Sequence, residues 1–445
     1  MRILFVCHQF PPETSGGAET HALQLGRALR QLGEEVFVFA AAAHYAGVGE
    51  RPREESVSGL PVRRVPPAGS TDLIGALSDP RVEQAFSDYV AQVRPEVVHF
   101  HHVGRLSTQL VSMAAERGLP RVATLHDFWY LCPRVNLVQI NGSLCEGPDE
   151  GRECVRAGCL AATWPPAPLA GGGASGRLIR SVVSLLPPGL RARLATAAGR
   201  GRRRPAAGTD ELARSRRRYE IMQEMLAHFS LVLSPSHFLM DSFLRHRLSP
   251  ERARYCEYGI DYSRFAGFQR TPRTGALRLG FAGGLHPHKA PHLLVEAAAR
   301  FAPSEVTVQV WGEGDPQYVA GLRRAAGPNV TLRGRYAAGE IAKAFAQFDV
   351  LVVPSMWYEN APCVIDEAFA TGTPVIATRL GGMAERVEHE KSGLLFAYGD
   401  ASALAGCMRR LADEPGLLER LREGIPRVTP VEEVANRIRV WCRAL

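Results

Sequence analysis

Two glutamates, Glu359 and Glu367, are separated by seven residues in the stretch PSMWYENAPCVIDEAFATG. Glu359 falls in a predicted loop, and Glu367 falls about a turn and a half inside the helix that is predicted to follow. An ionised carboxylate only accepts hydrogen bonds, so neither side chain can neutralise a phosphate, whereas both suit the hydroxyl groups of a sugar. The pair therefore indicates a site for a hydroxyl-rich ligand, and two unrelated solvated glutamates are the alternative.

The residues around this pair predict the edge of a parallel sheet. The run DVLVVPS at 349–355 is typical of a buried strand, and MWYENA follows it as a loop. Pro362 suits the first helical position, and Gly372 is expected to end the helix. Ligands of open α/β sheets bind at the carboxyl ends of strands, and a helix N-terminus favours an anion. We therefore expect a phosphate group between the two glutamates.

Short apolar runs alternate with helical patterns along the whole chain, which predicts parallel βα units. The pattern opens with a strand at 3–7 and a helix at about 18–32, and it starts again near residue 277. A length of 445 residues suggests two or three domains. We predict an α/β protein whose two doubly wound domains join near 256–265, a pattern that does not by itself select a function.

The composition favours a folded protein of a reducing compartment. Apolar residues make up 46% of the chain and charged residues 22%, which excludes a disordered chain. No run approaches eighteen apolar residues, and the opening MRILFVCH leads into a strand-like run and not into a secretory signal. The nine cysteines are an odd number, which fits reduced thiols better than a disulfide framework. We expect a cytoplasmic protein.

Positive charge is concentrated in an insertion at about 160–220. Thirteen arginines lie between Arg156 and Glu220 against three acidic residues, a balance of 13 − 3 = +10, so the remainder of the chain is near neutral at 8 − 10 = −2. The insertion is either a disordered or loosely helical segment or a contact with an anionic membrane surface through 170–208, on the inner face of the plasma membrane. Nucleic acid is not an expected partner, because no nucleic-acid-binding motif accompanies the arginines.

Four cysteines gather in the stretch 132–159 and allow two interpretations. Tetrahedral binding of a structural zinc ion by four thiolates is one, and free or redox-active thiols are the other. The intervals between them contain twelve, eight and four residues and no CxxC pair, so the zinc signal is moderate. The candidate ligands are Cys132, Cys145, Cys154 and Cys159.

The glutamate pair, together with AFATGTPVIA, GGMAE and SGLLF after it, resembles the retaining nucleotide-sugar glycosyltransferases of family 4, which have the GT-B fold. The stretches PPETSGGAETHALQLGRAL, TLHD, GIDYSRF and FAGGLHPHKAPHLL extend the resemblance over most of the chain. It implies an acceptor-side Rossmann-like domain at 1–255, a nucleotide-sugar-binding Rossmann-like domain at 256–425, and a helix at 426–445 that packs back on the first domain. The two domains would face each other across a cleft.

The implied activity is retaining transfer of a sugar from a nucleotide-diphosphate sugar to a glycan, lipid-linked or small-molecule acceptor, in the synthesis of cell-surface polysaccharide or glycoconjugates. No catalytic metal is implied, and the chain has no Asp-x-Asp motif of the kind that holds one. The alternatives are a GT-B enzyme that does not transfer sugars, such as a nucleotide-sugar epimerase or a phosphorylase, and a non-catalytic scaffold that binds sugar nucleotides.

The resemblance also implies roles for single residues. Glu359 would bind the transferred sugar, His126 would reach the donor sugar from the first domain, and Lys289 would place a cation on the departing diphosphate. Glu367 would hold the ribose. The remaining donor-binding residues would be Gly16, Gly17, Gly283, Gly284, Gly334, Arg335, Tyr336, Asn360, Ala361, Cys363 and Val364.

The chain departs from the family pattern at two places. Gly283-Gly284 stands where many members have Gly-Arg, which removes one expected phosphate-binding cation, so that Lys289 carries more of this task or another arginine substitutes. Ala290 stands where a glycine commonly follows the lysine. The departures leave the identity of the donor open, and they leave the two glutamates in place.

Overall fold

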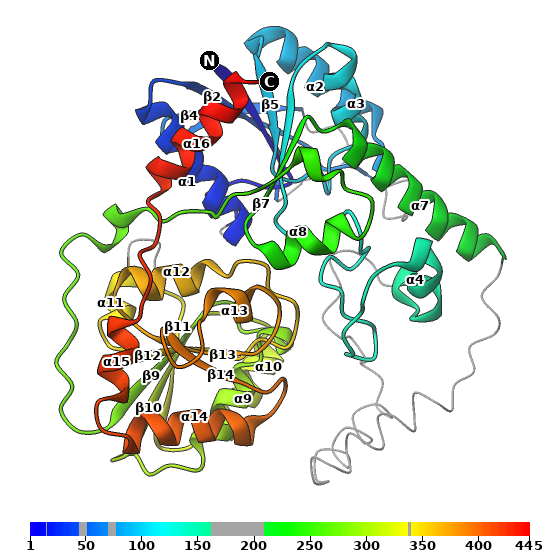
Figure 1. The fold of residues 1–445 in the computed structure, drawn as a ribbon. Helices are drawn as coiled ribbons and strands as arrows, with labels where there is room; N and C mark the ends of the chain where they lie inside the picture. Colours follow the sequence, from blue (N-terminus) through cyan, green and yellow to red (C-terminus); the bar gives the residue numbers. More distant parts are fainter. Residues whose placement is uncertain (15, 44–50, 70–76, 162–208, 337–339) are drawn as a thin grey trace.

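Two sheets, one in each half of the chain, organise the protein. The computed structural model describes residues 1–14, 16–43, 51–69, 77–161, 209–336 and 340–445. The first sheet has the strand order β3-β4-β2-β1-β5-β6-β7-β8, and the second has the order β11-β10-β9-β12-β13-β14 (Figure 1). All neighbouring strands run parallel except β3 and β4, which are antiparallel. The prediction of two α/β domains is confirmed.

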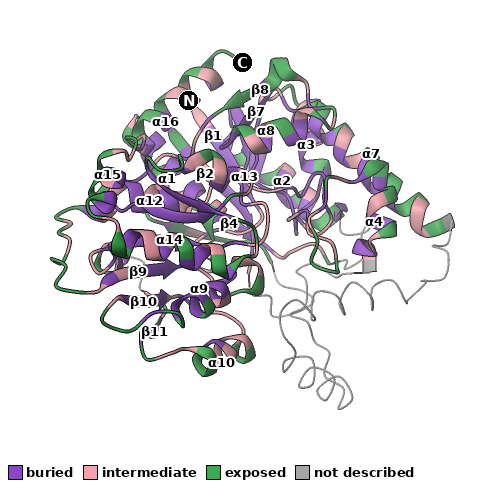
Figure 2. Cartoon of the chain, turned by 60° about the horizontal axis from the view of Figure 1, so that its bottom comes forward, coloured by how far each residue is buried: buried purple, intermediate pink, exposed green. Residues whose placement is uncertain are grey.

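The strands of the first sheet are β1 (Arg2–Cys7), β2 (Glu35–Ala41), β3 (Arg53–Val57), β4 (Leu60–Val65), β5 (Val97–Phe100), β6 (Arg121–Thr124), β7 (Leu231–Ser234) and β8 (Ala253–Tyr255). Those of the second are β9 (Leu277–Ala282), β10 (Val306–Trp311), β11 (Val330–Gly334), β12 (Val350–Val353), β13 (Val375–Thr378) and β14 (Gly393–Phe396). Central strands such as β5 and β12 are buried along their whole length, because helices cover both faces of each sheet (Figure 2).

Helices precede or follow nearly every strand. The first half contains α1 (Gly17–Gln31), α2 (Pro80–Val93), α3 (Gln109–Glu116), α4 (Arg152–Arg156), α7 (Thr209–His228) and α8 (His237–Leu244). The second contains α9 (Pro291–Ala298), α10 (Pro316–Ala325), α11 (Ile341–Phe345), α12 (Cys363–Ala370), α13 (Gly381–Arg386), α14 (Ala401–Asp413), α15 (Leu417–Glu423) and α16 (Val431–Arg443).

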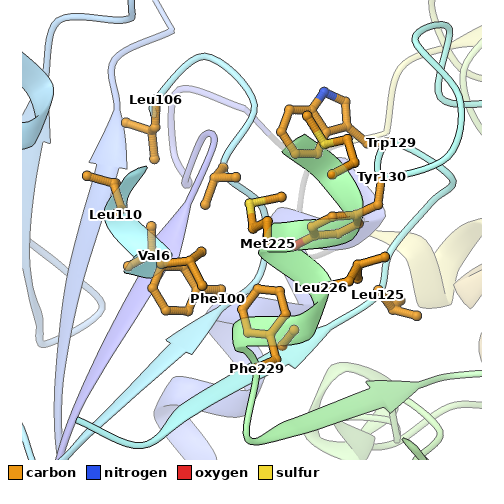
Figure 3. Close-up of a cluster of buried hydrophobic side chains, with 14 of the residues drawn as sticks. Val6, Phe100, Leu106, Leu110, Leu125, Trp129, Tyr130, Met225, Leu226 and Phe229 are labelled. Carbon is orange, nitrogen blue, oxygen red and sulfur yellow. The ribbon is translucent and has the colours of Figure 1, made fainter. Parts of the chain in front are cut away.

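The side chains of β1 contribute to two hydrophobic cores, because successive residues of a strand point to opposite faces of the sheet. Leu4 and Val6 of β1 join the core that includes α2, α3 and α7, whereas Ile3 and Phe5 join the core beneath α1 and α16. Figure 3 shows part of the first of these cores, with Phe229 among the labelled residues. The second sheet repeats this arrangement with its own two cores.

The last helix, α16, returns to the first half of the chain and packs against α1 (Figure 1). Its apolar face is buried there, with Val434 and Ile438 at its centre, and full burial of such a side chain contributes about 1.5–3 kcal/mol. The returning segment runs beside the outgoing one, since Ile260 N donates to Thr429 O at 2.9 Å and Val431 N donates to Ile260 O at 2.9 Å. Two segments of the chain therefore connect the two halves of the molecule. The limits predicted at residues 255 and 425 stay predictions.

The end of the predicted insertion belongs to the fold. Residues 209–220 form the first part of α7, and Ser215 and Arg218 of this helix are buried. The segment at 170–208, for which we predicted a membrane contact, lies outside the described residues. No helix in the described part of the chain is long and apolar enough to span a membrane.

Candidate active site

Glu359 lies in the loop between β12 and α12 and is paired with Lys289. Lys289 Nζ donates to Glu359 Oε1 at 2.6 Å, and Ser355 Oγ donates to the same oxygen at 2.8 Å. Burial acts to raise the pKa of Glu359, but the charge and hydrogen bond of Lys289 and the bond from Ser355 hold it below its usual value. The carboxylate is therefore ionised at neutral pH although only 5% of the residue is exposed.

Lys289 reaches this carboxylate from the loop after β9. Met356 N donates to His288 O at 2.7 Å, which fastens the loop after β12 to the loop after β9. The ammonium group also lies 5.0 Å from the centroid of the Trp357 ring, a cation–π distance. The structure thus brings together a cation and a carboxylate that are seventy positions apart in the sequence, at the carboxyl ends of adjacent strands.

Glu367 lies inside α12, which begins at Cys363, and it is also part of an ion pair. Arg264 Nη1 donates to Glu367 Oε1 at 2.8 Å. Burial raises the pKa of Glu367, and the charge of Arg264 opposes this rise only in part. Arg264 was not among the predicted site residues. It stands in GIDYSRF, and nothing in that stretch indicates that its guanidinium meets a glutamate 103 positions away.

The start of α12 is open to an anion. The helix begins at Cys363, and Pro362 occupies the N-cap, one position earlier than we predicted, without a side-chain hydrogen bond to the first N–H groups. These N–H groups and the helix dipole favour a phosphate at this end. Cys363 stands at the helix start as a neutral thiol, because burial raises its pKa to about 12. Ala361 and Val364 flank the same helix end.

The glycine-rich loop after β9 keeps backbone geometry that suits glycine. Gly283 has a φ of 152°, and Ala290 has a φ of 52°, in the left-handed region that costs an ordinary residue about 1–2 kcal/mol. Ala290 thus adopts the left-handed backbone conformation that favours glycine, at the position where the family commonly has a glycine. Gly284 carries no cation, and Arg264 is an arginine that the structure places within the site instead.

Three predicted residues lie at the end of β11, an edge strand of the second sheet: Gly334 is its last residue, and Arg335 and Tyr336 follow it. Gly334 has a φ of 76° and accepts a hydrogen bond from Gly312 N at 2.8 Å. Tyr336 is packed against the core beside α12, and burial together with the charge of Glu367 raises its pKa to about 12. Arg335 is exposed and lies 4.0 Å from Glu313. Tyr336 is therefore the member of this trio that shares surroundings with Glu367.

His126 follows β6 and faces α12 from the first half of the chain, but its imidazole is engaged elsewhere. Nδ1 lies 2.8 Å from the Tyr258 hydroxyl, and Nε2 lies 3.1 Å from His101 Nδ1. Its backbone oxygen makes the contact across the cleft, accepting from Asn360 Nδ2 at 2.6 Å. Burial and neighbouring histidines keep the pKa of His126 well below its usual value, so the ring is neutral. Both ring nitrogens of His126 thus have partners within the protein.

Gly16 and Gly17 lie at the start of α1, close to α12. A Cβ atom on Gly17 would lie 3.7 Å from Cys363 Sγ, so the first loop of the chain abuts the start of α12. Other polar residues that were not predicted gather nearby. Among them, His102 Nδ1 accepts from Gly104 N at 2.9 Å, which leaves the ring proton on Nε2, 3.5 Å from Asp127. His102 follows β5 and Asp127 follows β6, so no single stretch of sequence indicates that the two side chains meet.

The four clustered cysteines are buried free thiols. Burial raises the pKa of each, to about 11 for Cys159, so they are protonated at neutral pH. Within the described ranges, which include all four, no group of three or more histidine, cysteine or acidic side chains is placed to hold a metal ion. The predicted zinc site at Cys132, Cys145, Cys154 and Cys159 is therefore not supported, because the thiols are near one another without forming a ligand set.

Known protein families match both halves of the chain. The family described as Glycosyltransferase Family 4 matches residues 15–143, and Glycosyl transferases group 1 matches residues 276–414. The chain belongs to the family 4 glycosyltransferases. Glycogen synthase of Mycobacterium tuberculosis is 24% identical to this glycosyltransferase over 432 residues, which cover 94% of this chain and 88% of that protein.

Closer relatives match this glycosyltransferase over shorter segments. Putative glycosyltransferase YtcC of Bacillus subtilis is 35% identical over 153 residues, or 32% of this chain and 38% of that protein. D-inositol 3-phosphate glycosyltransferase of Stackebrandtia nassauensis is 31% identical over 226 residues, or 46% of this chain and 50% of that protein. The aligned segments thus span half or less of these two relatives.

Solved structures extend the likeness to the whole fold. Anabaena Alr3699/HepE in complex with UDP superposes on this glycosyltransferase with a TM-score of 0.65 at 17% identity, covering 100% of both chains. Sucrose-phosphate synthase from Thermosynechococcus elongatus superposes with a TM-score of 0.66 at 20% identity, covering 100% of this chain and 98% of that one. The fold is GT-B, as predicted from the sequence.

Proposed function

We propose that this glycosyltransferase moves a sugar from a nucleotide-diphosphate donor to a hydroxyl group of an acceptor, with retention of the anomeric configuration. The observation that carries the proposal is the 2.6 Å pair of Lys289 and Glu359 beside the open start of α12. A departing diphosphate needs positive charge, and a transferred sugar needs hydrogen-bond acceptors. The cation of Lys289 and the acceptor oxygens of Glu359 lie side by side, at the carboxyl ends of β9 and β12.

The proposed roles follow from what each group can do. The N–H groups at the start of α12 hold the diphosphate, and Lys289 turns from Glu359 towards it when the donor binds. The released Glu359 carboxylate then accepts hydrogen bonds from the sugar. Glu367 accepts from the ribose hydroxyls beside Arg264. Glu359 is assigned the binding of the transferred sugar and not a covalent attack on it.

The donor is tested by a thermal-shift screen of UDP-, GDP- and ADP-sugars, followed by detection of the released nucleotide. UDP-sugars come first, because solved neighbours were obtained with UDP and with UDP-glucose. Release that depends on an added acceptor supports transfer. Conversion of the sugar without an acceptor would instead support an epimerase, and binding without any turnover would support a scaffold. Full turnover in the presence of EDTA is expected for metal-independent transfer.

For the acceptor we propose a glycan or a lipid-linked sugar, in polysaccharide or glycoconjugate synthesis at the inner face of the membrane. The segment 170–208 contains eight arginines and no acidic residue, a composition that favours anionic lipid headgroups. Flotation with vesicles of phosphatidylglycerol and phosphatidylcholine tests this contact. We expect the whole chain to float at low salt and a chain without residues 170–208 to stay in solution, and equal flotation of both would contradict the proposal.

A further inference from the structure

A carboxylate from the second half of the chain caps a helix of the first half. Both oxygens of Glu385, in α13, accept hydrogen bonds from the start of α8: Oε1 from His237 N and Oε2 from Phe238 N, each at 2.8 Å. Ser236 Oγ accepts from the next N–H group, Leu239 N, at 3.2 Å. The open N–H groups of α8 are thus shared between its own N-cap and a carboxylate that arrives across the cleft.

The helix that carries Glu385 is fastened to the catalytic loop. Gly382 N donates to Glu359 O at 2.8 Å, and a Cβ atom on Gly382 would lie 1.7 Å from Asn360 O, so only glycine fits this contact. At the other end of α13, Arg386 Nε donates to Asp366 Oδ1 of α12 at 2.5 Å. A movement of α13 therefore carries both the loop of Glu359 and the nucleotide-side helix with it.

Aromatic side chains close the interface beside the cap. The ring of Tyr358, the residue before Glu359, lies 5.2 Å from the ring of Phe238 and 6.3 Å from that of Phe128. α8 and α13 face each other at this place, between the two halves of the molecule (Figure 1). Opening the cleft must break the two Glu385 bonds and separate these rings together, so the cap and the rings act as one contact.

We infer that Glu385 is a positioning residue for the transfer reaction: its carboxylate holds the two domains closed and thereby keeps Glu359 opposite His126. A cap within one domain would serve only its helix, whereas this cap joins the two halves of the molecule, beside the bond from Asn360 to His126 O and the rings around Tyr358. Glu385 is exposed at the edge of the interface, so water can replace its bonds and the closure is reversible. The inference rests on the proposed function only in its consequence for sugar transfer.

The contact between Glu385 and the start of α8 can be weakened from either side. One substitution removes both hydrogen bonds, and the other removes the bond from His237 N. Glu385→Ala removes the carboxylate. His237→Pro removes the N–H group, at the first helical position where proline is tolerated, after a residue that already has the extended conformation proline requires (φ −143°, ψ 152°). His237→Ala keeps the N–H group and removes the ring that stacks on Tyr255, so it controls for the side chain. Glu388→Ala removes a nearby exposed carboxylate that pairs with Lys391.

The first readout is the radius of gyration from small-angle scattering, with and without UDP, because it reports closure whether or not transfer occurs. We expect Glu385→Ala to enlarge the molecule and to lower the ratio of closed to open molecules with UDP roughly three- to tenfold, as the loss of a helix cap predicts. His237→Pro should act in the same direction to a smaller extent, because the bond from Phe238 N remains. The double variant should resemble Glu385→Ala alone, because that substitution already removes the bond from His237 N. His237→Ala and Glu388→Ala should resemble the wild type.

The second readout is the ratio of donor hydrolysis to transfer, which rises when an open cleft admits water. A role in folding alone would lower the melting temperature and leave both readouts unchanged, and that result would overturn the inference. Additive effects of Glu385→Ala and His237→Pro would overturn it as well. If the wild type transfers no sugar with any donor, the proposed function fails, while the scattering result still decides the role of Glu385.

Discussion

Lys289 and Glu359 form an ion pair of 2.6 Å that occupies the place where the donor's diphosphate and sugar are proposed to meet. Each partner satisfies the other in the free protein, so the donor must divide them and offer each a new partner. The pair keeps a buried carboxylate ionised, and it costs binding energy that the diphosphate has to replace. It therefore links the stability of the free protein to the function of the site.

Replacement of Lys289 by methionine should destabilise the protein in a pH-dependent manner. Glu359 has a lowered pKa in the folded protein, so its contribution to stability is present above the unfolded pKa of about 4.3 and is lost as the pH falls through the folded value. Without Lys289, burial dominates and raises the pKa of Glu359, so that the ionised form opposes folding at pH 7. We expect a loss of about 2–4 kcal/mol in the free energy of unfolding at pH 7.

Urea denaturation of Lys289→Met at pH 7 and pH 4 measures this loss, which should shrink at the lower pH because protonated Glu359 needs no partner. Lys343→Met is the matched control, since Lys343 forms an exposed pair with Glu340 and its loss should change little at either pH. An equal loss at both pH values for Lys289→Met would mean that the ion pair is not its cause.

Replacement of Glu367 by glutamine should separate stability from nucleotide binding. Burial raises the pKa of Glu367 in the folded protein, so its ionisation opposes folding above the unfolded pKa, while below that pH the group does not oppose folding. Glutamine removes this cost. At pH 7 we expect an unchanged or higher melting temperature together with about tenfold weaker UDP binding by calorimetry, since a charged hydrogen-bond acceptor is lost. A lower melting temperature with unchanged affinity would contradict the assignment of Glu367 to the ribose.

Two glycine-to-alanine changes should have opposite effects. In Gly382→Ala the new methyl group would lie 1.7 Å from Asn360 O, so the loop that carries Glu359 must move. A Cβ atom on Gly406 meets nothing within 4 Å, and this residue lies inside α14. We expect Gly382→Ala to lose activity and Gly406→Ala to stabilise the protein by about 0.5–1 kcal/mol, because alanine suits a helix interior better than glycine. Wild-type activity in purified Gly382→Ala would show that the contact between α13 and the loop is dispensable.

Tyr258 should control the orientation of His126. Its hydroxyl lies 2.8 Å from His126 Nδ1 and belongs to the segment between the two sheets. Phenylalanine keeps the ring and removes this bond, leaving one nitrogen of His126 open to a ligand. Tyr258→Phe should change the Michaelis constant for the donor, whereas Tyr255→Phe, at an exposed position in β8, should not. Steady-state kinetics at varied donor concentration decide, and identical constants in Tyr258→Phe would exclude Tyr258 from this role.

The fold and the glutamate pair follow from local pattern. Buried strands, glycine-ended helices and the Glu359–Glu367 spacing are properties of short stretches, and periodicity is enough to place them. The partners of these residues are not local. Lys289 meets Glu359 across seventy positions, because parallel strands bring their carboxyl ends together only after the whole sheet has formed. Arg264 meets Glu367 across 103 positions and comes from the segment between β8 and β9.

Orientation and metal binding also lie beyond a sequence pattern. The sequence places His126 at a strand end, but the direction of its ring depends on Tyr258 and His101, which come from other segments. The cysteine spacing at 132–159 permitted a zinc site, yet spacing says nothing about the distances between thiols in the folded loop. The capping of α8 by Glu385 joins residues 148 positions apart, and no pattern in the sequence predicts it.

The central claim is that Glu359 holds the sugar during transfer while Glu367 and α12 hold the nucleotide. The most direct test compares the wild type with Glu359→Gln for acceptor-dependent release of the nucleotide and, separately, for UDP affinity. The account predicts that Glu359→Gln, in which Lys289 is released from the ion pair, binds UDP at least as tightly as the wild type and transfers sugar about 10²–10³ times more slowly, the size of effect expected for one group that stabilises the transition state. Transfer at the wild-type rate by Glu359→Gln would contradict it.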